Sequence, residues 1–156
     1  RGAVAVEAAI ILPILIALMM GVWEVGRLIQ VSMTLNSAAR EGARLAAGGT
    51  NNGVTMTVAM VQDAVRNHLT AAGFPAAAVS GAVIEVTNLS TNPWTDPGDG
   101  KPLDPFTVTV TIPAGEAFDS LHWVACTITG LTHLSAQVKW LCANDSEVVV
   151  NASLPL

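Results

Sequence analysis

The feature that most constrains this sequence is a long apolar run close to its N-terminal end. Residues 3–23 read AVAVEAAIILPILIALMMGVW, and Glu7 is the only charged residue in the run. A helix of this length measures about 32 Å, which is enough to cross a bilayer core of about 30 Å. We therefore expect residues 1–23 to form a hydrophobic stem that lies in a membrane or in the core of a filament.

The residues around the run indicate its orientation. Arg1 precedes it, so the positive-inside rule predicts a cytoplasmic N-terminus and an exported head formed by residues 24–156. The run exceeds the apolar region of a cleavable secretory signal, which is about 7–15 residues long, and no multi-residue basic segment precedes it. The chain does not begin with Met, so we expect it to be processed or trimmed.

Composition narrows the class of function. Hydrophobic residues make up 51% of the chain and charged residues 12%, whereas soluble globular chains contain about 25% charged residues. The apolar excess argues against disorder. With 12 acidic and 7 basic residues the formal charge is −5, which disfavours a nucleic-acid partner because such binding needs a basic face.

Glu7 and Pro13 interrupt the apolar run. A carboxylate in a membrane segment costs a few kcal/mol unless it has a partner. Glu7 therefore either lies at headgroup level or neutralises a buried cation, such as the N-terminal amine of a neighbouring subunit; a proton relay is a third alternative. Pro13 removes the backbone hydrogen bond to Ala9, which predicts a kink or a local loosening of the helix.

Residues 24–47 are predicted to continue the helix in amphipathic form, ending at Gly48 and Gly49. Apolar and small residues recur at spacings of three and four, which is the pattern of a packing seam. The seam consists of Leu28, Val31, Leu35, Ala38, Gly42 and Leu45. It can pack against the protein's own sheet or against a partner, while the apolar first half packs between subunits.

The rest of the head reads as a small α+β domain. Residues 54–72 have the apolar spacing of a second amphipathic helix. Alternating or β-branched segments within 82–151 predict an antiparallel sheet covered on one side by helix, with strands at 82–89, 106–112 and 134–142 and a short last one at 147–151. Within 115–130 the apolar spacing predicts a short helix. The fold class is therefore α+β, with a long N-terminal helix, a second helix and a small antiparallel sheet.

Residues 1–48 resemble the N-terminal region of TadE-like proteins, the pilin-like (pseudopilin) components of tight-adherence, or Flp-type, pilus systems. The resemblance rests on Arg1-Gly2, Glu7, Leu12-Pro13, the stretch from Glu24 to Arg27, and the stretch from Ala39 to Arg44. The family usually has Phe after the Glu, whereas this chain has Ala8. The matching features cover about a third of the chain.

The resemblance implies insertion into the bacterial inner membrane and later assembly into a cell-surface filament. A prepilin peptidase of such systems cuts after a Gly that precedes the apolar segment, which here places the cut between Gly2 and Ala3 and makes Glu7 the fifth mature residue. The implied partners are copies of this chain or other pilin-like subunits, the peptidase and the pilus assembly machinery. Stems would pack in the filament, and Glu7 would set their axial register by charge pairing.

Cys126 and Cys142 are the only cysteines. Because exported proteins are oxidised, we expect a disulfide between them, with a contribution of about 3 kcal/mol to stability. Two free buried thiols are the alternative. A zinc site that adds His122 and His133 is conceivable, although the spacing matches no usual pattern.

The segment 88–105 is a long loop rich in Pro and Gly, which is either functional or mobile. Asp96, Asp99 and Asp104 form a weak candidate for Ca²⁺ binding, since they lack EF-hand spacing. Trp94 either pins the loop or is an exposed contact residue. No catalytic motif is present, and the resemblance implies a structural filament subunit that needs no cofactor; the alternative is a membrane-tethered binding module that does not polymerise.

Overall fold

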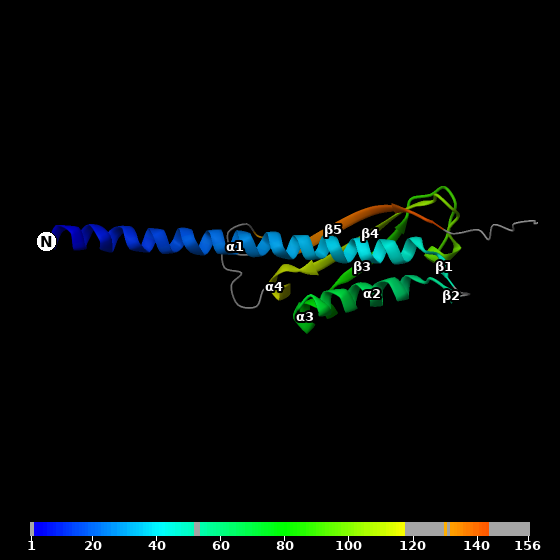
Figure 1. The fold of residues 1–156 in the computed structure, drawn as a ribbon, viewed down its shortest axis with the longest axis horizontal. Coiled ribbons are helices and arrows are strands. Elements are labelled where there is room, and N and C mark those ends of the chain that lie inside the picture. The colour runs from blue at the N-terminus through cyan, green and yellow to red at the C-terminus, as the bar shows by residue number, and fades with distance from the viewer. Residues whose placement is uncertain (1, 52–53, 118–129, 131, 144–156) are drawn as a thin grey trace, which may run out of the picture.

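The computed structural model describes residues 2–51, 54–117, 130 and 132–143 of the chain. It consists of a long helix that runs along one side of a small head and projects well beyond it (Figure 1). The helices are α1 (Gly2–Ala47), α2 (Val58–Ala71), α3 (Ala76–Ser80), the 3₁₀ helix η1 (Pro97–Asp99) and α4 (Ala114–Ala117). The strands are β1 (Thr50–Asn51), β2 (Val54–Thr55), β3 (Val83–Asn88), β4 (Pro105–Pro113) and β5 (His133–Leu141). The predicted α+β class with a long N-terminal helix is confirmed.

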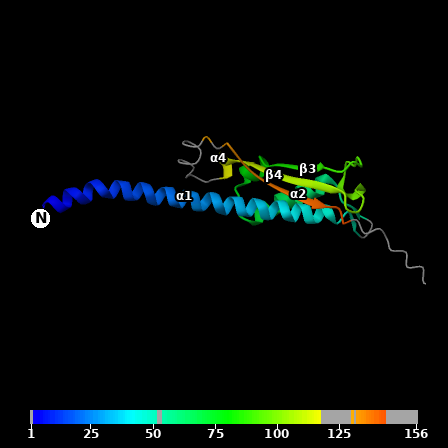
Figure 2. The ribbon, with the colours of Figure 1, turned by 90° about the horizontal axis from the view of Figure 1, so that it is seen from above.

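Helix α1 joins the expected stem and the expected helix 24–47 into one continuous element. Pro13 lies inside it and does not interrupt it. In Figure 2 the apolar part of α1 is bowed and the remainder lies against the head. The helix ends at glycines, as predicted, because Gly49 has a positive φ of 58° that other residues rarely adopt.

The three longer strands form one antiparallel sheet in the order β3-β4-β5. Val108 at the centre of β4 lies opposite Val86 of β3 and Val138 of β5. This register places the alternate apolar residues of β4 on one face, and all four are fully buried: Phe106, Val108, Val110 and Ile112. The strict alternation of the sequence therefore defined the inner face of the sheet.

Helices α1 and α2 cover that inner face. Helix α1 contacts β4, β5 and α2, and α2 contacts β3. The core is formed where these elements meet and includes Leu35 of α1, Val61 and Leu69 of α2, and Phe106 of β4. The part of α1 that follows Trp23 therefore belongs structurally to the head.

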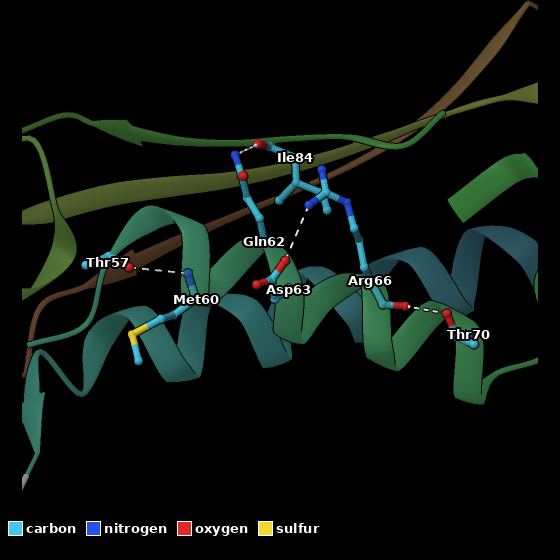
Figure 3. A network of polar contacts seen from close by, with 7 residues as sticks. All are labelled: Thr57, Met60, Gln62, Asp63, Arg66, Thr70 and Ile84. Carbon is cyan, nitrogen blue, oxygen red and sulfur yellow. Dashed lines mark hydrogen bonds and ion pairs between the residues drawn. The ribbon is translucent and has the colours of Figure 1, made fainter. Parts of the chain in front are cut away.

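The second helix begins later than the predicted residue 54. Val54–Thr55, which apolar spacing assigned to the helix, instead pairs with Thr50–Asn51 as a two-stranded antiparallel sheet. Thr57 is the N-cap, and its side chain accepts a hydrogen bond from the backbone N–H of Met60 at 3.4 Å (Figure 3). Helices α3 and η1 were not predicted. Most of the predicted helix within 115–130 and the predicted strand 147–151 lie outside the described residues.

Candidate assembly and membrane surface

The stem is covered by no other part of the described chain. All residues from Val6 to Met20 are exposed, among them Ile10, Leu12, Leu15 and Leu18. The helix is long and apolar enough to cross a membrane, and none of its most apolar stretch is buried inside the protein. Each such side chain gains about 1.5–3 kcal/mol on burial, and monomeric soluble proteins rarely expose continuous apolar surfaces larger than a few hundred Å². This surface therefore calls for a cover of lipid or of other helices.

Glu7 interrupts this surface near its N-terminal end. Its side chain is exposed on α1. The predicted cleavage residues Gly2 and Ala3 precede it within the same helix, and the structure places only their backbone. The predicted pairing of Glu7 with an amine would involve a second subunit, so it stays a prediction.

The boundary between stem and head lies near Trp23, where one face of α1 begins to be buried while Val25 and Ile29 on the outer face stay exposed. Trp23 is 68% exposed, whereas Glu24, which follows it, is only 8% exposed. Trp is enriched where membrane-spanning helices meet the headgroups, because its ring is apolar and its N–H is polar. Trp23 thus marks the level at which the membrane surface would lie beneath the head.

The predicted seam packs against the chain's own head and is not available to a partner. Val31, Leu35 and Ala38 are buried in the core, and Leu28 packs against it. Gly42 contacts α2 so closely that an added Cβ would lie 2.6 Å from Cγ2 of Val65. Of the two alternatives read from the sequence, the structure shows the packing on the protein's own helix and sheet.

Two of the three aspartates proposed as a weak Ca²⁺ site accept hydrogen bonds within the head, and the third is exposed. Asp96 accepts a hydrogen bond from the backbone N–H of Val58, at 2.8 Å, and so caps the start of α2. Asp104 accepts hydrogen bonds from the Ser90 hydroxyl at 2.7 Å and from the Lys101 N–H at 3.0 Å. The Ser90 hydrogen bond is the main cause that lowers the pKa of Asp104. Asp99 is exposed in η1.

The described residues contain no group of three or more His, Cys, Asp or Glu that could hold a metal ion. The Ca²⁺ hypothesis fails because the carboxylates of Asp96 and Asp104 face separate donors within the loop and on α2. The sequence could not reveal the capping bond, since 38 residues separate Asp96 from Val58.

Trp94 pins the long loop to the core. Its ring is half-buried and lies edge-on to Phe106, with the ring centroids 6.2 Å apart. The indole Nε1 is buried and has no hydrogen-bond partner among the residues that the structure describes. The ring is thus turned inward, and of the two roles read from the sequence the structure shows the pinning one.

Cys142 directly follows β5; it is buried and forms no disulfide with any residue that the structure describes. Burial is the main cause that raises the pKa of its thiol, and the nearby carboxylate of Asp104 raises it further. Cys126 and His122 lie outside the described residues, so the disulfide stays a prediction. His133 is exposed at the start of β5.

A groove of about 820 Å³ lies directly above the stem. One wall is the stretch of α1 from Val22 to Thr34, and the other is the connection from Ala72 to Pro75 between α2 and α3. Sequence reasoning missed it, because it forms only where α1 passes the end of α2. No sequence signal marks it apart from Gly73, whose φ of 85° turns the chain there.

Comparison with known proteins adds one finding. Neither the curated proteins nor the solved structures gave a match. The model of the family described as TadE-like protein matches residues 2–44. This range contains the stem, the boundary at Trp23 and most of the seam. Residues 2–44 are therefore similar to TadE-like proteins, and the resemblance read from the sequence is confirmed.

Proposed function

We propose that this chain is a structural subunit of a tight-adherence-type surface filament. The similarity to TadE-like proteins and the apolar helix fit a membrane-anchored protein associated with a Tad pilus. The further step is assembly: in this proposal the stem lies in the inner membrane until the subunit joins the filament, where the stems of neighbouring subunits cover one another. The protein then acts by packing, without a cofactor and without catalysis.

The exposed stem is the observation that carries this proposal. Residues 6–23 continue, without a break, a helix whose second half is fixed in the core of the head. A rod held in this way can move from lipid to a helical bundle without any refolding of the head. Both environments are apolar, so the transfer changes the neighbours of the stem and leaves its burial nearly unchanged.

Glu7 would set the register between neighbouring stems. Its exposed carboxylate lies close to the N-terminal end of the rod. An unpartnered carboxylate in an apolar filament core is costly, so an arrangement that pairs it with the N-terminal amine of a neighbour is favoured over other axial shifts. Cleavage between Gly2 and Ala3 by a prepilin peptidase would create that amine four residues before Glu7.

Electron microscopy of the purified full chain tests the proposal. We expect helical filaments after detergent removal, and dispersed particles would favour the membrane-tethered binding module instead. The variant Glu7→Ala should reduce the number and length of filaments by about tenfold or more. Glu85→Ala is the matched control, because Glu85 is exposed on β3 in the head, far from the stem.

Two further results would contradict the proposal. The first is that Glu7→Ala assembles as the wild type does, which would remove the role of charge pairing. The second is that Glu85→Ala fails to assemble to the same extent, which would indicate a general effect of charge. Mass spectrometry of the N-terminus in the assembled protein tests the processing separately, and Ala3 is the expected first residue.

A further inference from the structure

The groove above the stem continues into a second, apolar hollow. The two share Val22 and Trp23, so they form one continuous depression that crosses the boundary between head and stem. The lower hollow is lined only by apolar side chains of one helix face: Leu15, Leu18, Met19, Val22 and Trp23. The upper groove adds polar side chains of α1, namely Arg27, Gln30 and Thr34.

The upper groove holds a half-buried positive charge. Arg27 forms no ion pair with any residue that the structure describes. Gln30 lies one turn further along α1 and can donate from its side-chain amide, whereas the Thr34 hydroxyl already donates to the Gln30 carbonyl at 3.0 Å. The acidic residue nearest in sequence, Glu24, does not line the groove. The groove therefore offers donors and one net positive charge to an anion.

The dimensions fit the head-side leaflet of a bilayer. From Leu15 to Trp23 the helix rises about 12 Å, close to the hydrocarbon depth of one leaflet, which is about 15 Å. Arg27 lies about 6 Å above Trp23 along the helix, at headgroup level. The depression is thus apolar where acyl chains lie and cationic where phosphates lie.

We propose that this depression binds one anionic phospholipid, with its phosphate on Arg27 and Gln30 and an acyl chain along Leu15, Met19 and Val22. Phe74 and Pro75, on the opposite wall, would cover the glycerol region. The inference rests on the membrane-anchoring part of the proposed function and is independent of filament assembly. A lipid held in this way would fix the height of the head above the membrane.

Native mass spectrometry of the delipidated full chain in detergent tests the inference. We expect one bound dioleoyl phosphatidylglycerol at concentrations at which dioleoyl phosphatidylcholine leaves the protein mostly free. Arg27→Gln should weaken phosphatidylglycerol binding about tenfold, the size of one lost charge-assisted hydrogen bond. Arg40→Gln is the matched control, because Arg40 is an exposed arginine on the same helix above the groove, and its binding should equal that of the wild type.

A second pair of variants tests the shape of the site without changing its charge. Gly26 lines the groove and a Cβ added there meets no atom within 4 Å, so Gly26→Leu should extend into the groove and reduce lipid retention while the head stays folded. Gly21→Leu is the control, because Gly21 has the same free space and does not line the depression. Circular dichroism of each variant verifies the fold.

Three outcomes would overturn the inference. The first is that Arg27→Gln binds phosphatidylglycerol as tightly as the wild type does. The second is that Arg40→Gln loses as much phosphatidylglycerol binding as Arg27→Gln. The third is that soluble glycerol 3-phosphate displaces the lipid, which would mean that the acyl chain contributes nothing. Filaments without a retained lipid would refute the lipid site alone, whereas a retained lipid without filaments would refute assembly alone.

Discussion

Gly42 of α1 and Val65 of α2 lie in direct contact, so that a Cβ atom added at Gly42 would be 2.6 Å from Val65 Cγ2. Real Cβ atoms essentially never approach another atom so closely. The same added atom would also lie 3.5 Å from side-chain atoms of Val61 and Val108. The contact therefore fixes how closely α2 approaches α1, at the level where the sheet covers both.

Gly42→Ala is expected to destabilise the head by about 1–3 kcal/mol, because the added methyl group overpacks a buried contact. The higher helix propensity of Ala, worth about 1 kcal/mol, opposes part of this loss. Thermal unfolding of the full chain in detergent measures the change. The control is Gly26→Ala, where no atom lies within 4 Å of the added Cβ and a stabilisation of up to about 1 kcal/mol is expected. Equal effects of the two substitutions would contradict the close contact.

The sequence carried the information for the rod, the seam and the inner face of the sheet. Each of these depends on a periodicity: an unbroken apolar run for residues 3–23, a spacing of three and four for the seam, and strict alternation from Phe106 to Ile112. Periodicity identifies which face is buried but does not name its partner. Leu35 and Ala38 therefore fitted a neighbouring subunit as well as the chain's own sheet, and only the structure distinguished the two.

Contacts between segments far apart in the chain could not be predicted. The carboxylate of Asp96 was interpreted as a Ca²⁺ ligand because a loop aspartate has no local signal for capping a helix that begins 38 residues earlier. The short β1–β2 pair was missed for a local reason, because Val54 continues the apolar spacing of α2 and was therefore assigned to the helix. The groove at Arg27 depends on where the end of α2 meets α1.

Asp96→Ala should lower the free energy of unfolding by about 1 kcal/mol, because the N–H of Val58 loses its capping acceptor. Thr57→Ala should cost less, since the bond from Met60 to Thr57 is longer, 3.4 Å against 2.8 Å. Urea unfolding of the two variants compares them. Addition of Ca²⁺ should leave the urea midpoint of the wild type unchanged. A higher midpoint in the presence of Ca²⁺ would support the Ca²⁺ site that the structure argues against.

The Ser90–Asp104 hydrogen bond should make stability depend on acid pH. The Ser90 hydroxyl lowers the pKa of Asp104 in the folded state. The hydrogen bond therefore contributes its full stabilisation above the pKa of Asp104 in the unfolded chain, about 3.9 for Asp. This stabilisation is lost as the pH falls through the lower pKa of Asp104 in the folded protein. Ser90→Ala should therefore lose stability at neutral pH and differ less from the wild type at pH 2–3. Unfolding midpoints measured across this range test the expectation; a difference that does not change with pH would contradict it.

Cys142 should react slowly with thiol reagents in the folded protein. It is buried, and its thiol pKa is raised first by burial and then by Asp104, so little thiolate is present at neutral pH. We expect labelling by a disulfide reagent only after unfolding. Non-reducing mass analysis decides whether the predicted disulfide with Cys126 forms instead, since that bond would lower the mass by two hydrogen atoms and abolish labelling in urea.

Gln62 of α2 forms a hydrogen bond to the edge strand of the sheet. Its side-chain amide donates a hydrogen bond to the carbonyl of Ile84 on the edge strand β3, at 3.0 Å, across the gap between α2 and the sheet (Figure 3). Gln62→Ala leaves this half-buried carbonyl to water and should cost about 0.5–1.5 kcal/mol. Asp63→Ala is the matched control, because its ion pair with Arg66 is exposed and long at 3.6 Å, and the expected change is within about 0.5 kcal/mol.

An edge strand that loses this partner also exposes a carbonyl to pairing with other chains. We therefore expect Gln62→Ala to aggregate faster than Asp63→Ala when each variant is held the same number of degrees below its own unfolding temperature. Light scattering measures the aggregation rate. This comparison separates protection of the edge strand from stability. If Gln62→Ala only lowered stability, its aggregation rate would equal that of Asp63→Ala once both variants have the same unfolded fraction. Equal aggregation rates under these conditions would show that Gln62 stabilises the fold but does not prevent other chains from pairing with the edge strand.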